Sequence, residues 1–89
     1  MDHMLGGWSS FGTVSEEDIN VFEDALRGLT GCSYTPLLVA TQVVAGKNYC
    51  FLCKGEVVIP DRPEFAALVY IYQPLEGEPH LMEIRRVTP

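Results

Sequence analysis

The segment that organises the fold is residues 34–58, which read YTPLLVATQVVAGKNYCFLCKGEVV. Its first part, 34–45, is rich in Val, Leu, Thr and Tyr, which mostly favour strands. The pattern resumes over 48–58 after Ala45-Gly46-Lys47, whose glycine can take the positive φ that a tight hairpin needs. The sequence therefore predicts two long antiparallel strands joined by a short turn.

A helix is predicted before this hairpin, over residues 16–29. Ser15 is a favourable N-cap, because its hydroxyl can accept a hydrogen bond from the backbone amide of Asp18. Apolar residues then recur at steps of three and four, which places them on one helix face. These residues are Ile19, Phe22, Leu26 and Leu29. Gly28 or Gly31 can adopt the left-handed conformation that ends a helix.

Two further strands are predicted after the hairpin, over 65–73 and 80–87, separated by the loop 74–79. One amphipathic helix followed by strands with short connections indicates an α+β fold, in which the helix packs across a four- to five-stranded antiparallel sheet. The 89 residues suffice for a single domain. Residues 1–12 contain three glycines and no sustained apolar period, so we expect an extended, mobile arm there.

The charge balance argues against nucleic acid as a partner. The chain carries 12 acidic and 6 basic residues, a net charge of −6, whereas phosphate binding needs clustered Lys and Arg. Anionic membrane surfaces are disfavoured for the same reason. No apolar run approaches the length of about 18–20 residues that spans a bilayer, so we expect no membrane association.

The cysteines indicate neither a disulfide framework nor a metal site. Three cysteines cannot pair completely, which favours a reducing compartment. Cys50 and Cys53 have the spacing of a redox or metal motif, but residues three apart in a strand point to opposite faces. His3 and His80 stand at no familiar zinc spacing from them. We therefore expect free thiols, no metal and no cofactor.

A resemblance to a known family adds to this reading. Gln42-Val43-Val44-Ala45-Gly46, followed by Lys47-Asn48-Tyr49, resembles the inhibitory hairpin of the cystatins and lies at the tip of the first predicted hairpin, where that family has it. Gly6-Gly7 precedes the helix as the trunk glycine of those inhibitors does. The loop with Leu75 and Gly77 stands where the family has its second hairpin, although both are equally explained as ordinary turn residues.

Two departures make the chain more similar to the stefins, the small intracellular cystatins without disulfides. The second hairpin lacks the Pro-Trp pair of secreted cystatins, and Trp8 is the only tryptophan. No cysteine follows Cys53, so the C-terminal disulfides of secreted cystatins have no counterpart. Trp8 has two possible positions, over the helix start or at the rim of an interface.

The resemblance implies a reversible, tight-binding inhibitor of papain-like, cathepsin-type cysteine proteases, with no catalysis of its own. In the family a trunk and two hairpins form an apolar wedge that occludes the protease cleft. The protease-binding residues implied here are Leu5, Gly6, Gly7, Gln42, Val43, Val44, Ala45, Gly46, Leu75 and Gly77. We expect a monomer, with strand exchange at the first hairpin as a route to a swapped dimer. The expected location is the cytoplasm, or outside the cell if an upstream signal peptide has been removed.

Two rival functions belong to other classes. A cystatin-like module could bind a non-protease partner, since a fold does not settle function. A small thiol oxidoreductase could use Cys50 and Cys53.

Overall fold

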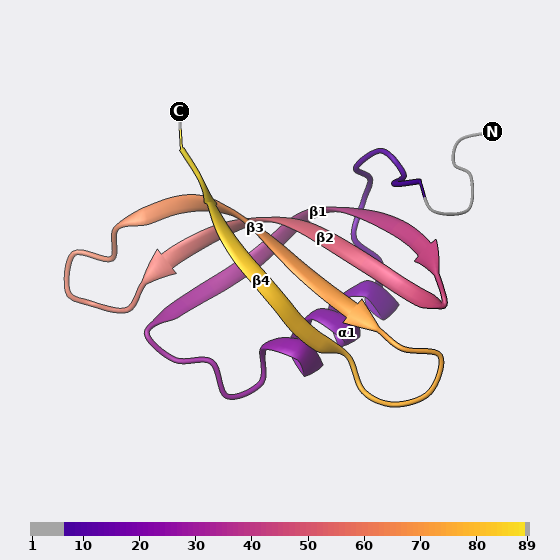
Figure 1. The fold of residues 1–89 in the computed structure, drawn as a ribbon. Coiled ribbons are helices and arrows are strands. Elements are labelled where there is room, and N and C mark those ends of the chain that lie inside the picture. Colours follow the sequence, from indigo (N-terminus) through magenta and orange to yellow (C-terminus); the bar gives the residue numbers. More distant parts are fainter. Residues whose placement is uncertain (1–6, 89) are drawn as a thin grey trace.

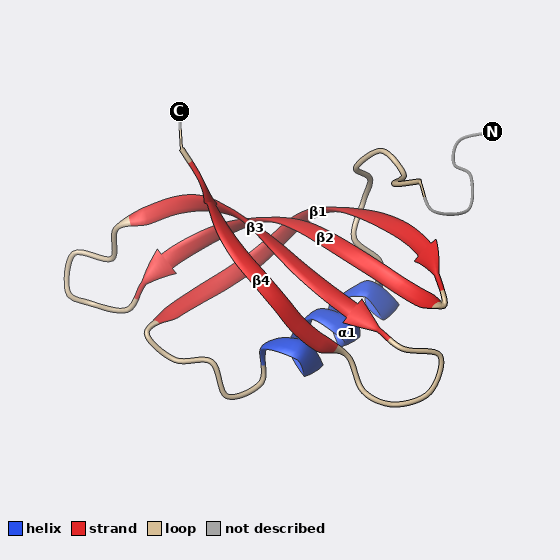
Figure 2. Ribbon diagram, viewed as in Figure 1, coloured by secondary structure: helices blue, strands red, loops and turns tan. Residues whose placement is uncertain are grey.

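The computed structural model describes residues 7–88 and shows one helix packed across one face of a four-stranded antiparallel sheet (Figure 1). The elements are α1 (Glu16–Leu26), β1 (Cys32–Val44), β2 (Gly46–Val57), β3 (Glu64–Gln73) and β4 (His80–Val87). The strands lie in sequence order, β1-β2-β3-β4. The predicted α+β class is confirmed, with four strands in the described part of the chain (Figure 2).

The start of α1 follows from its capping residues. Ser15 accepts a hydrogen bond from the Asp18 amide at 3.1 Å, and the Asp18 carboxylate accepts one from the Ser15 amide at 3.0 Å. This reciprocal pair satisfies two amides that a helix start leaves without partners. The predicted N-cap at Ser15 is confirmed, and the Asp18 carboxylate completes a capping box.

The helix ends at Leu26 instead of the predicted residue 29. Arg27 leaves the helical conformation with ψ 130°, and Gly28 turns the chain with φ +87°. Leu29 therefore lies outside the helix and is exposed, and Ile19 is exposed as well. The predicted apolar face is wrong at these two positions, and Val21 and Ala25 join Phe22 and Leu26 against the core in their place.

The core lies between α1 and the sheet. Phe22 meets Phe51 of β2 edge to face, with ring centroids 4.9 Å apart. Val69 and Ile71 of β3 complete the fully buried layer. Such aromatic contacts and apolar burial supply most of the stabilisation available to a domain of this size.

Residues 7–12 are fastened to the sheet, which corrects the expectation of a mobile arm for this part of 1–12. Isolated bridges join Trp8 to Gln42 and Gly12 to Val39, along the outer edge of β1. The Gly12 and Val39 amides each donate to the other residue's carbonyl, at 2.9 and 3.0 Å. The segment occupies the place of a fifth strand without forming a regular one.

Candidate functional site

Two of the three connections between neighbouring strands lie at the same end of the sheet. The β1–β2 turn and the β3–β4 loop emerge there, near where residues 7–8 meet β1 (Figure 1). The strand register brings the two turns to this end, because Lys47 at the start of β2 lies opposite Gln73 at the end of β3. We call this region the hairpin end and define it as residues 7–8, 42–47 and 73–78.

The first turn is very tight. Val43 pairs with Lys47 and Val44 with Gly46, so Ala45 alone connects the strands. Gly46 has φ +103°, a conformation that disfavours any side chain. Val43 is 44% exposed and Ala45 is also exposed, whereas Val44 is half-buried. The result is a narrow tip with small side chains, which have few rotamers to lose on docking.

Below the tip, Gln42 and Asn48 hold the two strands together. The Asn48 side-chain amide donates to the Gln42 side-chain carbonyl at 2.8 Å. The backbone of Gln42 also forms the bridge to Trp8. Gln42 therefore links the N-terminal segment to the base of the hairpin.

The second loop presents a single large apolar side chain. Leu75 is 80% exposed, more than any other large hydrophobic side chain among the described residues. Gly77 takes φ +112° and closes the loop. Glu76 and Glu78 flank it, both exposed and without an ion pair to any described residue.

The structure thus brings most of the predicted residues together. Gly7, the segment 42–46, Leu75 and Gly77 all belong to the hairpin end. Leu5 and Gly6 lie outside the described residues.

Trp8 does not lie over the helix start, which was the first of its two predicted positions. The second, at the rim of an interface, stays a prediction. The Trp8 ring meets Tyr70 edge to face on the sheet surface opposite α1, with centroids 6.3 Å apart, and 43% of it stays exposed. Trp8 and Phe11 border an apolar groove of about 270 Å³, which has Cys50 among its lining residues. This volume falls below the range typical of small-molecule sites, about 300–1,000 Å³.

Two residues that the sequence did not suggest organise the hairpin end from β3. The Tyr72 hydroxyl donates to the Ala45 carbonyl at 2.5 Å. The Gln73 side-chain amide donates to the Gly77 carbonyl at 2.8 Å and to the Pro74 carbonyl at 3.2 Å. The available sequence signal was their position as the last residues of an apolar strand before a loop.

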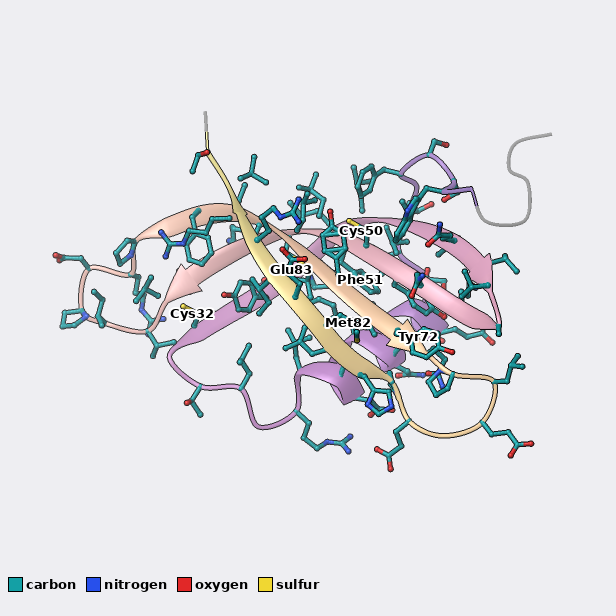
Figure 3. All side chains as sticks on the ribbon, in the orientation of Figure 1. Cys32, Cys50, Phe51, Tyr72, Met82 and Glu83 are labelled. Carbon is teal, nitrogen blue, oxygen red and sulfur yellow. The ribbon has the colours of Figure 1, made fainter. Side chains whose placement is uncertain are left out.

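Cys50 and Cys53 point to opposite faces of the sheet, and both are poorly suited to nucleophilic chemistry. Cys53 packs in the core beneath α1. Cys50 faces the opposite side of the sheet (Figure 3), as predicted from the spacing of the two residues. Burial raises the pKa of Cys50 and raises that of Cys53 to about 12. A reactive thiol needs a lowered pKa, so the geometry gives no support to the oxidoreductase alternative.

Acidic residues of α1 act on Tyr49, which lies on the face of the sheet that packs against the helix. Tyr49 is buried, and its pKa is raised by that burial and by the nearby carboxylates of Asp18 and Glu17. The Lys47 ammonium lies 5.2 Å from the Tyr49 ring centre. The described residues contain no group of three or more side chains placed to hold a metal ion.

Comparisons of the chain with family models, curated proteins and solved structures found no match. Among the described residues, no helix has the length and apolar character needed to cross a membrane.

Proposed function

We propose that the protein is a stefin-like cystatin, a reversible, tight-binding, competitive inhibitor of papain-like cysteine proteases. The observation that carries this proposal is the place of the QVVAG segment, residues 42–46, at a turn that shares one end of the sheet with Gly7 and Leu75. A trunk and two hairpins side by side form the wedge that the family resemblance implies.

The surface chemistry of the hairpin end favours a protein partner. Exposed apolar side chains come from three separate segments, at Trp8, Val43 and Leu75. Apolar groups gathered on one surface commonly mark a binding site. A stable interface buries about 1,600 Å² in total and depends on a few central anchors. Val43 and Leu75 are the anchors we propose within the described residues.

The proposed mechanism is occlusion without covalent chemistry. The narrow tip and the glycine-bearing segment fill the protease cleft and exclude the substrate, so no acyl-enzyme forms. Gly7 allows close approach of the backbone to the enzyme, since it lacks a Cβ. Leu5, Gly6 and Gly7 would form the trunk contact. The inhibitor acts as a monomer with no cofactor, and strand exchange at the tip would remove the wedge.

A cytoplasmic location is part of the same proposal. None of the three cysteines, all described, forms a disulfide. Free thiols are typical of reducing compartments.

Titration of papain and a cathepsin-type enzyme tests the function, with hydrolysis of a fluorogenic peptide as the readout. Stoichiometric loss of protease activity is expected. Val43→Asp should raise the inhibition constant at least about tenfold, because it puts a charge on a proposed anchor. Val58→Asp is the matched control, since Val58 is 56% exposed and lies at the start of the β2–β3 connection.

The same titration separates the alternatives. A module for a non-protease partner predicts no inhibition at any ratio. A thiol oxidoreductase predicts reduction of insulin disulfides that Cys50→Ser abolishes.

A further inference from the structure

Two hydrogen-bond systems connect the end of β3 to both turns of the hairpin end. Tyr72 is the penultimate residue of β3, and its side chain lies at this end of the molecule (Figure 3). Its hydroxyl reaches the carbonyl of Ala45, the only tip residue without a cross-strand partner. The contact therefore holds the exposed residue that connects β1 to β2 from a strand outside that hairpin.

Gln73 organises the second loop and supports the first turn. Its side-chain amide bonds the Pro74 and Gly77 carbonyls, which closes the loop that presents Leu75. Its own backbone carbonyl occupies the space where a Cβ on Gly46 would stand. Adjacent residues of one strand thus contact both turns.

We propose that Tyr72 and Gln73 are positioning residues that preorganise the two turns as one rigid binding surface. A turn that is already ordered loses less conformational entropy when it docks, so its contacts contribute more to affinity. The Tyr72 bond fixes Ala45 in the free protein, and the Gln73 bonds fix the loop that carries Leu75. Neither residue needs to touch the partner for this effect. The affinity readout rests on the proposed function.

The Tyr72→Phe variant tests the first clamp, because it removes one hydroxyl and keeps the ring. Tyr34→Phe is the matched control, since Tyr34 also lies in the sheet but near Cys32, at the end opposite the hairpin end (Figure 3). Backbone order parameters of the free proteins, measured by NMR relaxation, report on the turn. In the wild type we expect values of about 0.85 at Ala45 and Gly46, falling towards about 0.6 in Tyr72→Phe.

The inhibition constant for papain should rise about three- to tenfold in Tyr72→Phe, as expected for the loss of one neutral hydrogen bond. Tyr34→Phe should change neither quantity. Gln73→Met is a second, independent test. In this variant we expect the order parameters to fall at Leu75–Gly77 and to stay unchanged at Ala45.

Each outcome bears on the positioning role separately from the inhibitor function. If the wild type inhibits no papain-like protease, the proposed function is wrong, while the order parameters still test the clamp. Unchanged order at Ala45 in Tyr72→Phe would overturn the inference. A mobile turn with an unchanged inhibition constant would overturn it too, as would equal weakening by Tyr72→Phe and Tyr34→Phe.

Discussion

Trp8 and Gln42 form an isolated antiparallel bridge, which fastens the segment after Gly7 to β1 one residue before Val43. Ser9 strengthens this attachment through two hydrogen bonds with Thr41. Its amide donates to the Thr41 carbonyl at 2.7 Å, and its hydroxyl accepts from the Thr41 amide at 2.9 Å. The sheet therefore fixes the position of Trp8 and Ser9 relative to the first turn.

The first prediction concerns the space at Gly7. Gly7→Leu should raise the inhibition constant about tenfold or more, because a side chain at the trunk keeps the backbone away from the enzyme wall. The thermal unfolding midpoint should stay unchanged. Gly12→Leu is the matched control in the same segment, since a Cβ at Gly12 meets no atom within 4 Å. Equal inhibition constants for the wild type, Gly7→Leu and Gly12→Leu would show that Gly7 is not part of the binding surface.

The sequence predicted the elements whose signals are local. The Ser15–Asp18 cap lies within four consecutive residues, and the strands carry their own apolar and β-branched patterns. The helix end was placed too late because Leu29 continues the apolar spacing, although Gly28 has already turned the chain. Periodicity alone does not show which of two nearby glycines breaks a helix first.

The missed features depend on contacts between distant residues. The attachment of residues 7–12 uses backbone atoms and one serine hydroxyl, so no side-chain pattern announces it. The Tyr72 contact with Ala45 joins residues 27 positions apart and depends on the register of β2 with β3. A tyrosine at the end of an apolar strand reads equally well as a core residue.

The second prediction concerns stability at the first turn. Gly46→Ala should destabilise the protein by about 1–3 kcal/mol in urea unfolding, because alanine disfavours φ +103°. The added Cβ would also collide with the Gln73 carbonyl and stand 3.1 Å from Pro74 Cα. Gly28→Ala isolates the backbone cost, since Gly28 has φ +87° and open space around it. We expect Gly46→Ala to be less stable than Gly28→Ala. Equal stability of the two variants would show that the close approach of Gly46 to β3 has no energetic effect.

The third prediction is a loss of stability in alkali caused by Cys53. Burial raises the pKa of this thiol from 9.0 to about 12 in the folded protein. The folded chain therefore keeps a proton that the unfolded chain releases, so the stabilisation is complete below pH 9 and declines as the pH rises towards 12. The contribution of Cys53 to the free energy of unfolding should be about 1.4 kcal/mol smaller at pH 10 than at pH 8.

Urea unfolding between pH 8 and 10 measures this slope. In Cys53→Ala the free energy of unfolding should fall less steeply with rising pH than in the wild type. In Cys32→Ala, which removes a half-buried thiol, it should fall more steeply than in Cys53→Ala. Identical slopes in the two variants would show that Cys53 ionises as readily in the folded protein as in the unfolded chain.

The fourth prediction decides between the two readings of Leu75. The side chain is 80% exposed, so Leu75→Ala should leave the unfolding free energy unchanged within about 0.5 kcal/mol. As a proposed anchor, however, it should lose roughly fivefold in affinity for papain when truncated, mainly through faster dissociation. Met82→Ala on β4 is the matched control, because Met82 is 64% exposed and lies outside the hairpin end. If Leu75→Ala dissociates from papain as slowly as Met82→Ala and the wild type do, Leu75 is an ordinary turn residue. The anchors would then lie only in the first turn and the trunk.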